Sequence, residues 1–386
     1  MKARHYLSSS ALAIALTTLG SVGSAEAQTE YSVGGYVKLD AMVTRTDSGD
    51  LPSGSIGRDF YIPGLTPIGG DSNTYTDFHA RESRIWLRAT QTLSNGEKIE
   101  GYFELDFLGT AGGDKRVTNS YSPRMRQIYL RYGNWLAGQT WTNFQDLAIL
   151  PEAPDFIGIA DATVFNRQAQ IRYTAGNGFS FALEAPESTV TPYQGGTSRV
   201  TTGDTAMPDI TARYSNKVNN VHYSIGGIMR RIEYRDVAAG VDDTVNAFGI
   251  NLTSKIEFGA HDLRLGVVHG QGLGRYVGVN FANAAVVNDT NRLDAIDLTS
   301  FSAAYRHVWN SKVRTNFIFS SIDVEELESL TGPAANKSSQ RIAANLMYQV
   351  NERLVVGGEI SRATREILSG AEGNLDRFQL SAQLSF

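Results

Sequence analysis

The final eleven residues of the chain, DRFQLSAQLSF, alternate strictly between polar and apolar side chains. Phe378, Leu380, Ala382, Leu384 and Phe386 fall on one face of a strand, and polar residues fall on the other. An amphipathic strand of about ten residues matches the length of a transmembrane β-strand. In a soluble sheet the apolar face would meet a core, whereas in a membrane barrel it meets lipid and the polar face lines a lumen. This strand alone leaves both arrangements open.

The amino terminus is typical of a cleaved export signal. Two basic residues precede an apolar stretch at 11–19, and an A-x-A site follows at 25–27. The stretch is too short to cross a bilayer as a helix, and no other run approaches 18 uninterrupted apolar residues. We therefore predict a signal peptide at residues 1–27 and a single domain at 28–386.

The composition excludes several kinds of site. The chain has no cysteine, which rules out disulfides, thiol nucleophiles and cysteine-ligated metals. Its 41% hydrophobic content is ordinary for a soluble protein and equally ordinary for a membrane β-barrel with an aqueous lumen, because half of each strand then faces water. The net charge of −5 says nothing about a pore, since loops and lumen contribute separately.

Turn signals recur at intervals of roughly 40 residues, which would fit two strands and one longer loop. Asn and Gly supply the positive φ that tight hairpins need. The turns lie at Ser94–Glu97, Gly133–Asn134, Gly176–Gly178, Asn216–Asn220, Phe258–His261, Asn310–Ser311 and Asn351–Glu352.

Segments of alternating polarity flank each turn, so the seven hairpins predict fourteen strands. A first strand at Tyr31–Val43 and the terminal strand raise the number to sixteen. Sixteen antiparallel strands close into a barrel that encloses an aqueous channel. The number could differ by two, because the alternation slips near Val221–Arg231 and Ile296–Trp309, where bulges would fit. The predicted fold class is an all-β transmembrane barrel.

The connections at the opposite end from the turns are long and rich in Gly, Pro, Asp and Asn, as extracellular loops of a barrel are. The longest run over Arg45–Phe78, Gly109–Ser122, Glu187–Met207 and Gly270–Asp294. Aromatic residues beside the short turns would form a girdle at the periplasmic interface. These aromatics are Trp135, Phe179, Phe258, Trp309 and Phe386.

Arginine outnumbers lysine 27 to 8, and many arginines fall on the predicted lumen face. The planar guanidinium binds carboxylate or phosphate through two hydrogen bonds, so a ladder of arginines would attract anions. The alternative is that lumen acids such as Glu100, Glu104 and Asp106 merely balance them. The predicted pore-lining set is Lys38, Arg84, Arg88, Arg124, Arg126, Arg131, Arg172 and Arg213, with the register unclear at Arg124 and Arg126.

The segment 143–166 after the fifth strand is long and too apolar to lie in open water. Folded into the barrel, it would bury Leu147, Ile149, Leu150, Phe156 and Ile157 against the wall. Its acids would then oppose the arginines across a narrow aperture and create a transverse field. The alternative is an extracellular loop that packs on its neighbours or on another subunit. The acids are Asp146, Glu152, Asp155 and Asp161.

Three stretches carry a resemblance to the trimeric porins of Gram-negative outer membranes, and within them to the DcaP-type porins, which are associated with dicarboxylate uptake. They are RMRQIYLRYGNWLAGQTWTNFQD at 124–146, FHARESRIWLRATQ upstream and FNRQAQIRYT downstream. The resemblance implies a sixteen-stranded homotrimer whose third loop constricts the pore and whose arginines select anions. A last strand that ends on Phe386 resembles the signal that the barrel-assembly machinery reads. Some members carry a helical segment before the first strand, and none is expected here.

We therefore expect an outer-membrane porin for passive diffusion of small hydrophilic solutes, with a preference for carboxylates and dicarboxylates. Expected partners are membrane lipids, lipopolysaccharide and small anions, with no nucleic acid, metal or other cofactor. The rival is a sugar channel, for which Trp86, Tyr102, Tyr129 and Trp141 could supply an aromatic track. Catalysis is not expected, because the histidines are scattered and neither G-x-S-x-G nor H-E-x-x-H occurs.

Overall fold

A computed structural model describes residues 29–109 and 118–386 of the chain. The predicted signal peptide at 1–27 lies outside the described residues. None of the helices in the described part is long and apolar enough to cross a membrane.

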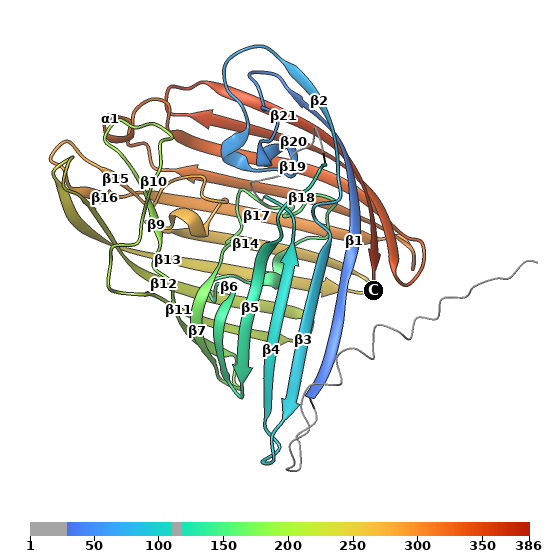
Figure 1. Cartoon of the computed structure of the whole chain (residues 1–386). Coiled ribbons are helices and arrows are strands. Elements are labelled where there is room, and N and C mark those ends of the chain that lie inside the picture. Colours follow the sequence, from blue (N-terminus) through green and yellow to red (C-terminus); the bar gives the residue numbers. More distant parts are fainter. Residues whose placement is uncertain (1–28, 110–117) are drawn as a thin grey trace, which may run out of the picture.

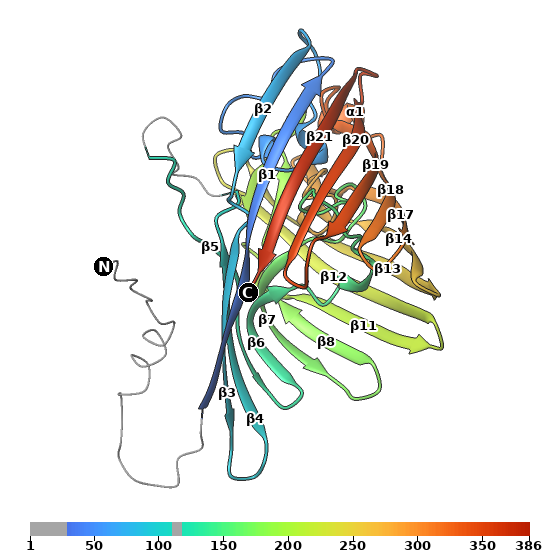
Figure 2. The same cartoon turned by 90° about the vertical axis from the view of Figure 1, so that its right-hand side faces the viewer.

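In the described residues, seventeen antiparallel strands occupy sixteen positions of one closed wall around an interior that holds several loops (Figures 1 and 2). β1 pairs with β21 along Tyr36–Thr46 and Ser385–Leu375, which closes the barrel. The strands are β1 (Thr29–Thr46), β2 (Asn73–His79), β3 (Arg84–Thr92), β4 (Lys98–Asp106), β5 (Arg124–Tyr132), β6 (Trp135–Trp141), β7 (Arg167–Thr174), β8 (Phe179–Glu184), β11 (Asp209–Val218), β12 (Val221–Asp236), β13 (Val241–Phe258), β14 (His261–Gln271), β17 (Asp297–Val308), β18 (Val313–Val324), β19 (Asn336–Gln349), β20 (Leu354–Ile367) and β21 (Glu372–Ser385).

The predicted number of strands is confirmed, with one irregularity. β2 and β3 are two parts of the same barrel position, because both pair with β1 and only residues 80–83 separate them. The seven predicted turns all connect neighbouring strands at one end of the barrel. At two of them Gly133 and Asn219 hold φ values of +53° and +54°, the left-handed conformation that favours Gly and Asn.

The predicted positions of the bulges are wrong. β12 and β17 keep continuous register with both of their neighbours, whereas the shifts occur at Glu104/Leu105 and Asn336/Ser338. The alternation in β12 is irregular for a different reason. Ile228 and Ile232 face inward and are buried against loops that fold into the barrel, so apolar residues occupy lumen positions there.

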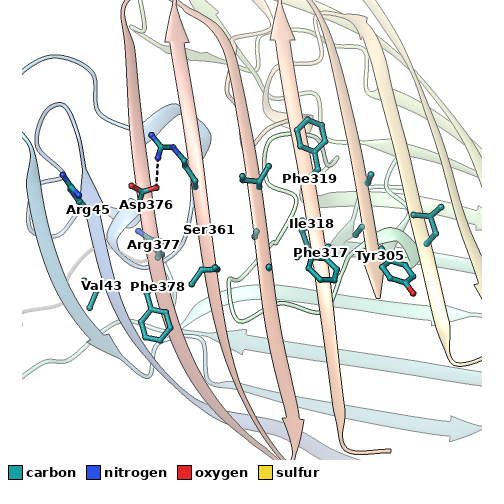
Figure 3. Close-up of a pocket in the computed structure, with 18 residues that line it drawn as sticks. Val43, Arg45, Tyr305, Phe317, Ile318, Phe319, Ser361, Asp376, Arg377 and Phe378 are labelled. Carbon is teal, nitrogen blue, oxygen red and sulfur yellow. Dashed lines mark ion pairs between the residues drawn. The ribbon is translucent and has the colours of Figure 1, made fainter. Parts of the chain in front are cut away.

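The outer face carries an apolar band with a charged upper edge (Figure 3). Val43, Phe378 and Ile360 form one exposed row across β1, β21 and β20, and the next row toward the loops is charged. In this charged row Asp376 pairs with Arg362 at 3.8 Å. Ten residue steps separate Asp376 from Phe386, about 33 Å along a strand and about 25 Å along the membrane normal at a tilt of about 40°. This height fits a bilayer core, and the predicted girdle aromatics are exposed at its other edge.

Two of the long loops, which connect β8 to β11 and β14 to β17, contain more regular structure than their composition predicts. They supply a second, four-stranded sheet over the mouth of the barrel, with strand order β10-β9-β15-β16. Val190, Ala285 and Leu293 of this sheet are buried against Ile232 and Val241 of the wall. The sheet and the short helices of the loops comprise β9 (Ser188–Thr191), β10 (Val200–Thr202), β15 (Ala285–Val287), β16 (Leu293–Ala295), η1 (Ile56–Arg58), η2 (Pro63–Leu65), η3 (Leu147–Ile149), η4 (Gly274–Tyr276) and α1 (Glu328–Thr331).

Gly35 occupies the point where β1 leaves β3 and meets the last strand. It exchanges backbone hydrogen bonds with Phe386, and a Cβ at this position would lie 2.1 Å from the carbonyl oxygen of Arg84. We expect Gly35→Ala to destabilise the barrel by about 1–3 kcal/mol, because backbone must shift to relieve the clash. The resistance of the folded barrel to heating in detergent, followed on a gel, measures this loss. Gly227→Ala is the matched control, because nothing lies within 4 Å of its Cβ, and an equal loss there would contradict the argument.

Candidate functional site

The loop between β6 and β7, residues 142–166 and hereafter the constriction loop, lies inside the barrel as predicted. Ile149 and Ile159 are buried against Ala304, Ile318 and Ala343, which face inward from β17, β18 and β19. Small and apolar lumen residues therefore form the surface, hereafter the seat, against which the loop packs. Removing the apolar side chains of the loop from water stabilises this position.

The predicted burial of the loop is correct in most places. Ile149 is 5% exposed and Ile157 is 3% exposed, and Leu150 and Phe156 are partly buried. Leu147 is the exception at 46%. It lies in η3, whose first turn is capped by Asp146 through a bond from the amide of Ala148, and the short helix turns Leu147 away from the seat.

Two acids in the first half of the loop are bound to the wall. Asp146 accepts hydrogen bonds from Thr253 at 2.6 Å and from His222 at 2.9 Å. Glu152 forms a two-point ion pair with Arg314, in which Nε lies 2.5 Å from Oε2. Both contacts attach the loop to strands on the far side of the lumen from β3–β7.

The other two acids are buried more deeply. Asp161 accepts hydrogen bonds from Tyr61 at 2.8 Å and from Ser320 and Ser339 at 2.7 Å each. Asp155 accepts from the amide of Tyr61 at 2.9 Å and from amides of its own loop. Burial favours the neutral acid, but the charge of Arg341 and these amides hold the pKa of Asp155 below its usual range. Burial instead raises the pKa of Asp161.

Tyr61 belongs to the first loop, between β1 and β2, which also folds into the lumen. Tyr61 is buried with Phe60 against Ile157 of the constriction loop, and Phe60 meets Phe156 edge-on at 5.1 Å. Sequence reasoning missed this insertion. The apolar run FYIPGL at 60–65 was the available signal, since it is as unsuited to open water as the constriction loop.

The predicted arginines line the opposite wall, on β3–β7 and β11. Near the short turns, Arg88 is 43% exposed in its side chain and lies 3.4 Å from Glu100. Its guanidinium lies over the rings of Trp86 and Tyr102 at 5.6 and 5.5 Å. Arg131 is exposed over the ring of Tyr129 at 5.8 Å.

Two further arginines on this wall bind neutral partners. Arg172 donates to the carbonyl of Trp141 and to Gln170, and Arg213 donates to the carbonyl of Gln145 at 3.1 Å. Arg213 also lies 3.9 Å from Asp146. Carbonyl and amide oxygens orient both guanidinium groups, and Arg172 forms no ion pair with another described residue.

Nearer the loops, the bulge between β4 and β5 places both Arg124 and Arg126 inward, where the register was unclear from sequence. Both bind Asp106, at 2.7 and 2.8 Å, and Arg126 also binds Glu104 at 2.6 Å. Arg84 lies 3.9 Å from the same Glu104. This part of the wall is therefore a network of paired charges.

The acids of the constriction loop do not face this network. Phe156 does, since the guanidinium groups of Arg124 and Arg126 lie 5.7 and 5.5 Å from its ring. Arg167, which strict alternation places on the face opposite Arg172 and which sequence reasoning missed, lies over Trp141 at 4.6 Å.

Lys38 is on the predicted list but is only 3% exposed. Its ammonium binds Glu82 at 2.5 Å, Asp40 at 3.4 Å and the carbonyl of Pro154 in the constriction loop at 2.8 Å. The structure therefore places it as a cation that fixes the loop. Its inward position on β1 was correctly read from alternation.

Across β3–β7 as a whole, positive charge prevails. These strands carry seven arginines and Lys98 against three acids. Among residues 29–109 and 118–386, Arg131, Arg167 and Arg172 form no ion pair within 4 Å. In the same described ranges, no group of three or more His, Asp and Glu side chains is arranged to hold a metal.

Comparisons with known proteins agree on the architecture. A sequence model described as DcaP outer membrane protein matches residues 62–386. A crystal structure of the outer membrane channel DcaP of Acinetobacter baumannii superposes with a TM-score of 0.75 at 20% identity, covering 94% of this chain and 99% of that one. No curated protein sequence matches the chain.

Two other solved structures share the fold more distantly. An anion-selective porin from Comamonas acidovorans has a TM-score of 0.58 at 12% identity, covering 93% of this chain and all of that one. A trimer form of OmpT, an outer membrane protein of Vibrio cholerae, has a TM-score of 0.53 at 11% identity, covering 93% and 99%.

Proposed function

Because the chain belongs to the DcaP outer membrane protein family, and is thus an outer-membrane porin, we propose that its pore prefers anions and passes small carboxylates and dicarboxylates. The short turns then lie at the periplasm and the long loops outside the cell. We further propose a homotrimer that is exported by the signal at 1–27, inserted through the strand ending at Phe386, and surrounded by lipid and lipopolysaccharide. The trimer form of OmpT and the anion selectivity of the Comamonas porin support these details by likeness of fold.

The observation that carries the anion preference is the imbalance of charge on β3–β7. Arginines there exceed acids, and Arg131 and Arg172 are oriented by ring or carbonyl contacts, with no ion pair to another described residue. In the confined lumen such charges raise the local concentration of anions and lower that of cations. Arginine also matches the planar geometry of a carboxylate.

In this proposal the four acids of the constriction loop hold the loop in place and do not set the ion selectivity. Asp146, Asp155 and Asp161 are almost fully buried in contacts with the wall or within the loop, and Glu152 is paired with Arg314. Three of them attach the loop to β12, β13, β18 and β19, and Asp155 attaches it to the first loop. The positive wall is then left to determine the sign of the selectivity.

We expect the reversal potential of the purified protein in a potassium chloride gradient to show preference for chloride. The aromatic row supports the rival sugar channel, since Trp86, Tyr102 and Tyr129 are stacked at 6.1 and 5.1 Å. The same experiment therefore includes a maltooligosaccharide. A pore without ion preference that is blocked by the sugar would replace the anion proposal with the sugar channel.

A further inference from the structure

A pocket at the extracellular mouth lies apart from the arginine wall. It has a volume of about 330 Å³ and lies between η2, the β9–β10 connection, the segment at 279–283, the β18–β19 connection and the end of β20. Ligand sites for small molecules start at about this size. Its lining is mixed, with polar side chains beside Ile62, Phe281 and Val324.

Two arginines line this pocket, and neither forms an ion pair with another described residue. Arg199 donates from Nε to Asn283 at 2.8 Å and from Nη2 to the carbonyl of Asn280 at 2.6 Å. Arg365 donates from Nε to Asn336 at 2.8 Å and from Nη1 to the carbonyl of Thr66 at 2.9 Å. Within the described ranges, Nη1 of Arg199 and Nη2 of Arg365 have no hydrogen-bond acceptor.

The two arginines are held in the same way. Asn283 donates its amide to Thr191 at 2.8 Å and to the carbonyl of Ser198 at 2.9 Å, which turns its oxygen toward Arg199. Asn336 donates its amide to the carbonyl of Phe281 at 2.6 Å, which turns its oxygen toward Arg365. Each guanidinium is thus oriented by a fixed asparagine while keeping its charge and one free donor group.

We propose that this pocket binds a small carboxylate anion before the anion reaches the arginine wall. Two guanidinium groups outweigh Glu325, the one acid in the lining, so the pocket carries a net positive charge. The partners of both arginines are neutral oxygens, so each guanidinium keeps its positive charge. Each can therefore complete its hydrogen bonding with an incoming anion. The role in uptake rests on the proposed function, whereas the binding itself does not.

The test is calorimetric titration of succinate into the full-length protein in detergent. We expect Arg199→Gln/Arg365→Gln to weaken binding by about tenfold or more, since each removed guanidinium loses charged hydrogen bonds. Arg235→Gln/Arg292→Gln is the matched control: both arginines are exposed, Arg235 at the end of β12 and Arg292 between β15 and β16, where they pair with Asp242 and Asp243, and neither lines the pocket. The control should bind as the unaltered protein does.

A third variant separates this site from the wall. Arg88→Glu/Arg131→Glu should lose anion selectivity in the channel yet keep succinate binding at the mouth, because both of those residues lie near the periplasmic turns and neither lines the pocket. If the wall variant loses binding and the mouth variant keeps it, the mouth proposal is overturned and the anion wall is supported. Absence of succinate binding by the unaltered protein, or an equal loss in the control, also overturns the mouth site.

Discussion

Reversing Arg88 and Arg131 together should lower the ratio of anion to cation permeability on the order of tenfold. The double change Arg88→Glu/Arg131→Glu alters the charge of the wall by four units. Both residues neighbour Glu100, through a 3.4 Å contact and through direct pairing in the β4–β5 register. The variant therefore gathers three carboxylates at one level of the lumen, where they attract cations and repel anions.

The measurement is the reversal potential in a potassium chloride gradient near 0.1 M, where screening over about 10 Å leaves the effect visible. Arg88→Gln/Arg131→Gln should give an intermediate ratio, because it removes two charges without adding any. Arg235→Glu/Arg292→Glu makes the same four-unit change at exposed positions near the long loops and should have little effect. An unchanged ratio in the wall variant would remove these arginines from the mechanism.

The wall could be predicted from sequence because a strand has a period of two. Arg84, Arg88 and Arg131 follow alternation that is interrupted by turns rich in Asn and Gly, so their face is fixed locally. The bulge at Arg126 breaks that period, so its register was unclear from sequence. Arg167 was missed because strict alternation places it on the face opposite Arg172, although its guanidinium lies over Trp141.

The partners of charged side chains could not be predicted in this way. Lys38 and Asp161 are correctly placed by alternation and by loop assignment, yet their roles depend on residues far along the chain. Pro154 lies 116 positions from Lys38, and Ser339 lies 178 positions from Asp161. Whether a lumen charge is exposed or anchors a loop depends on such long-range contacts, which no local pattern contains.

The same limit applies to the extracellular loops. Composition predicted irregular connections, and β9, β10, β15 and β16 instead form a sheet. Strands of three residues, such as Ala285–Val287, are too short for an alternating pattern to be recognised in the sequence. They are stable because their apolar residues pack against Ile232 and Val241 of the wall, which requires the barrel to be present.

The second large effect expected is from Asp161→Ala, which should release the loops in the lumen. Asp161 is fully buried and accepts hydrogen bonds from Tyr61 of the first loop and from Ser320 and Ser339 of the wall. One carboxylate thus ties two inserted loops to two strands. Its removal leaves three buried hydroxyls without their acceptor, which we expect to cost about 2–4 kcal/mol in the stability of the loop arrangement.

Single-channel recording checks this expectation, because the barrel wall keeps its own backbone ladder while the loops gain freedom. We expect a larger mean conductance and more frequent transitions between levels. Asp161→Asn is the matched control: its oxygen can still accept from Tyr61 and Ser339, so most of the normal conductance should return. Because burial raises the pKa of Asp161, the neutral amide also avoids the cost of a buried charge. An Asp161→Ala channel as quiet and as narrow as the unaltered one would show that apolar packing of Ile149 and Ile159 suffices to hold the loop.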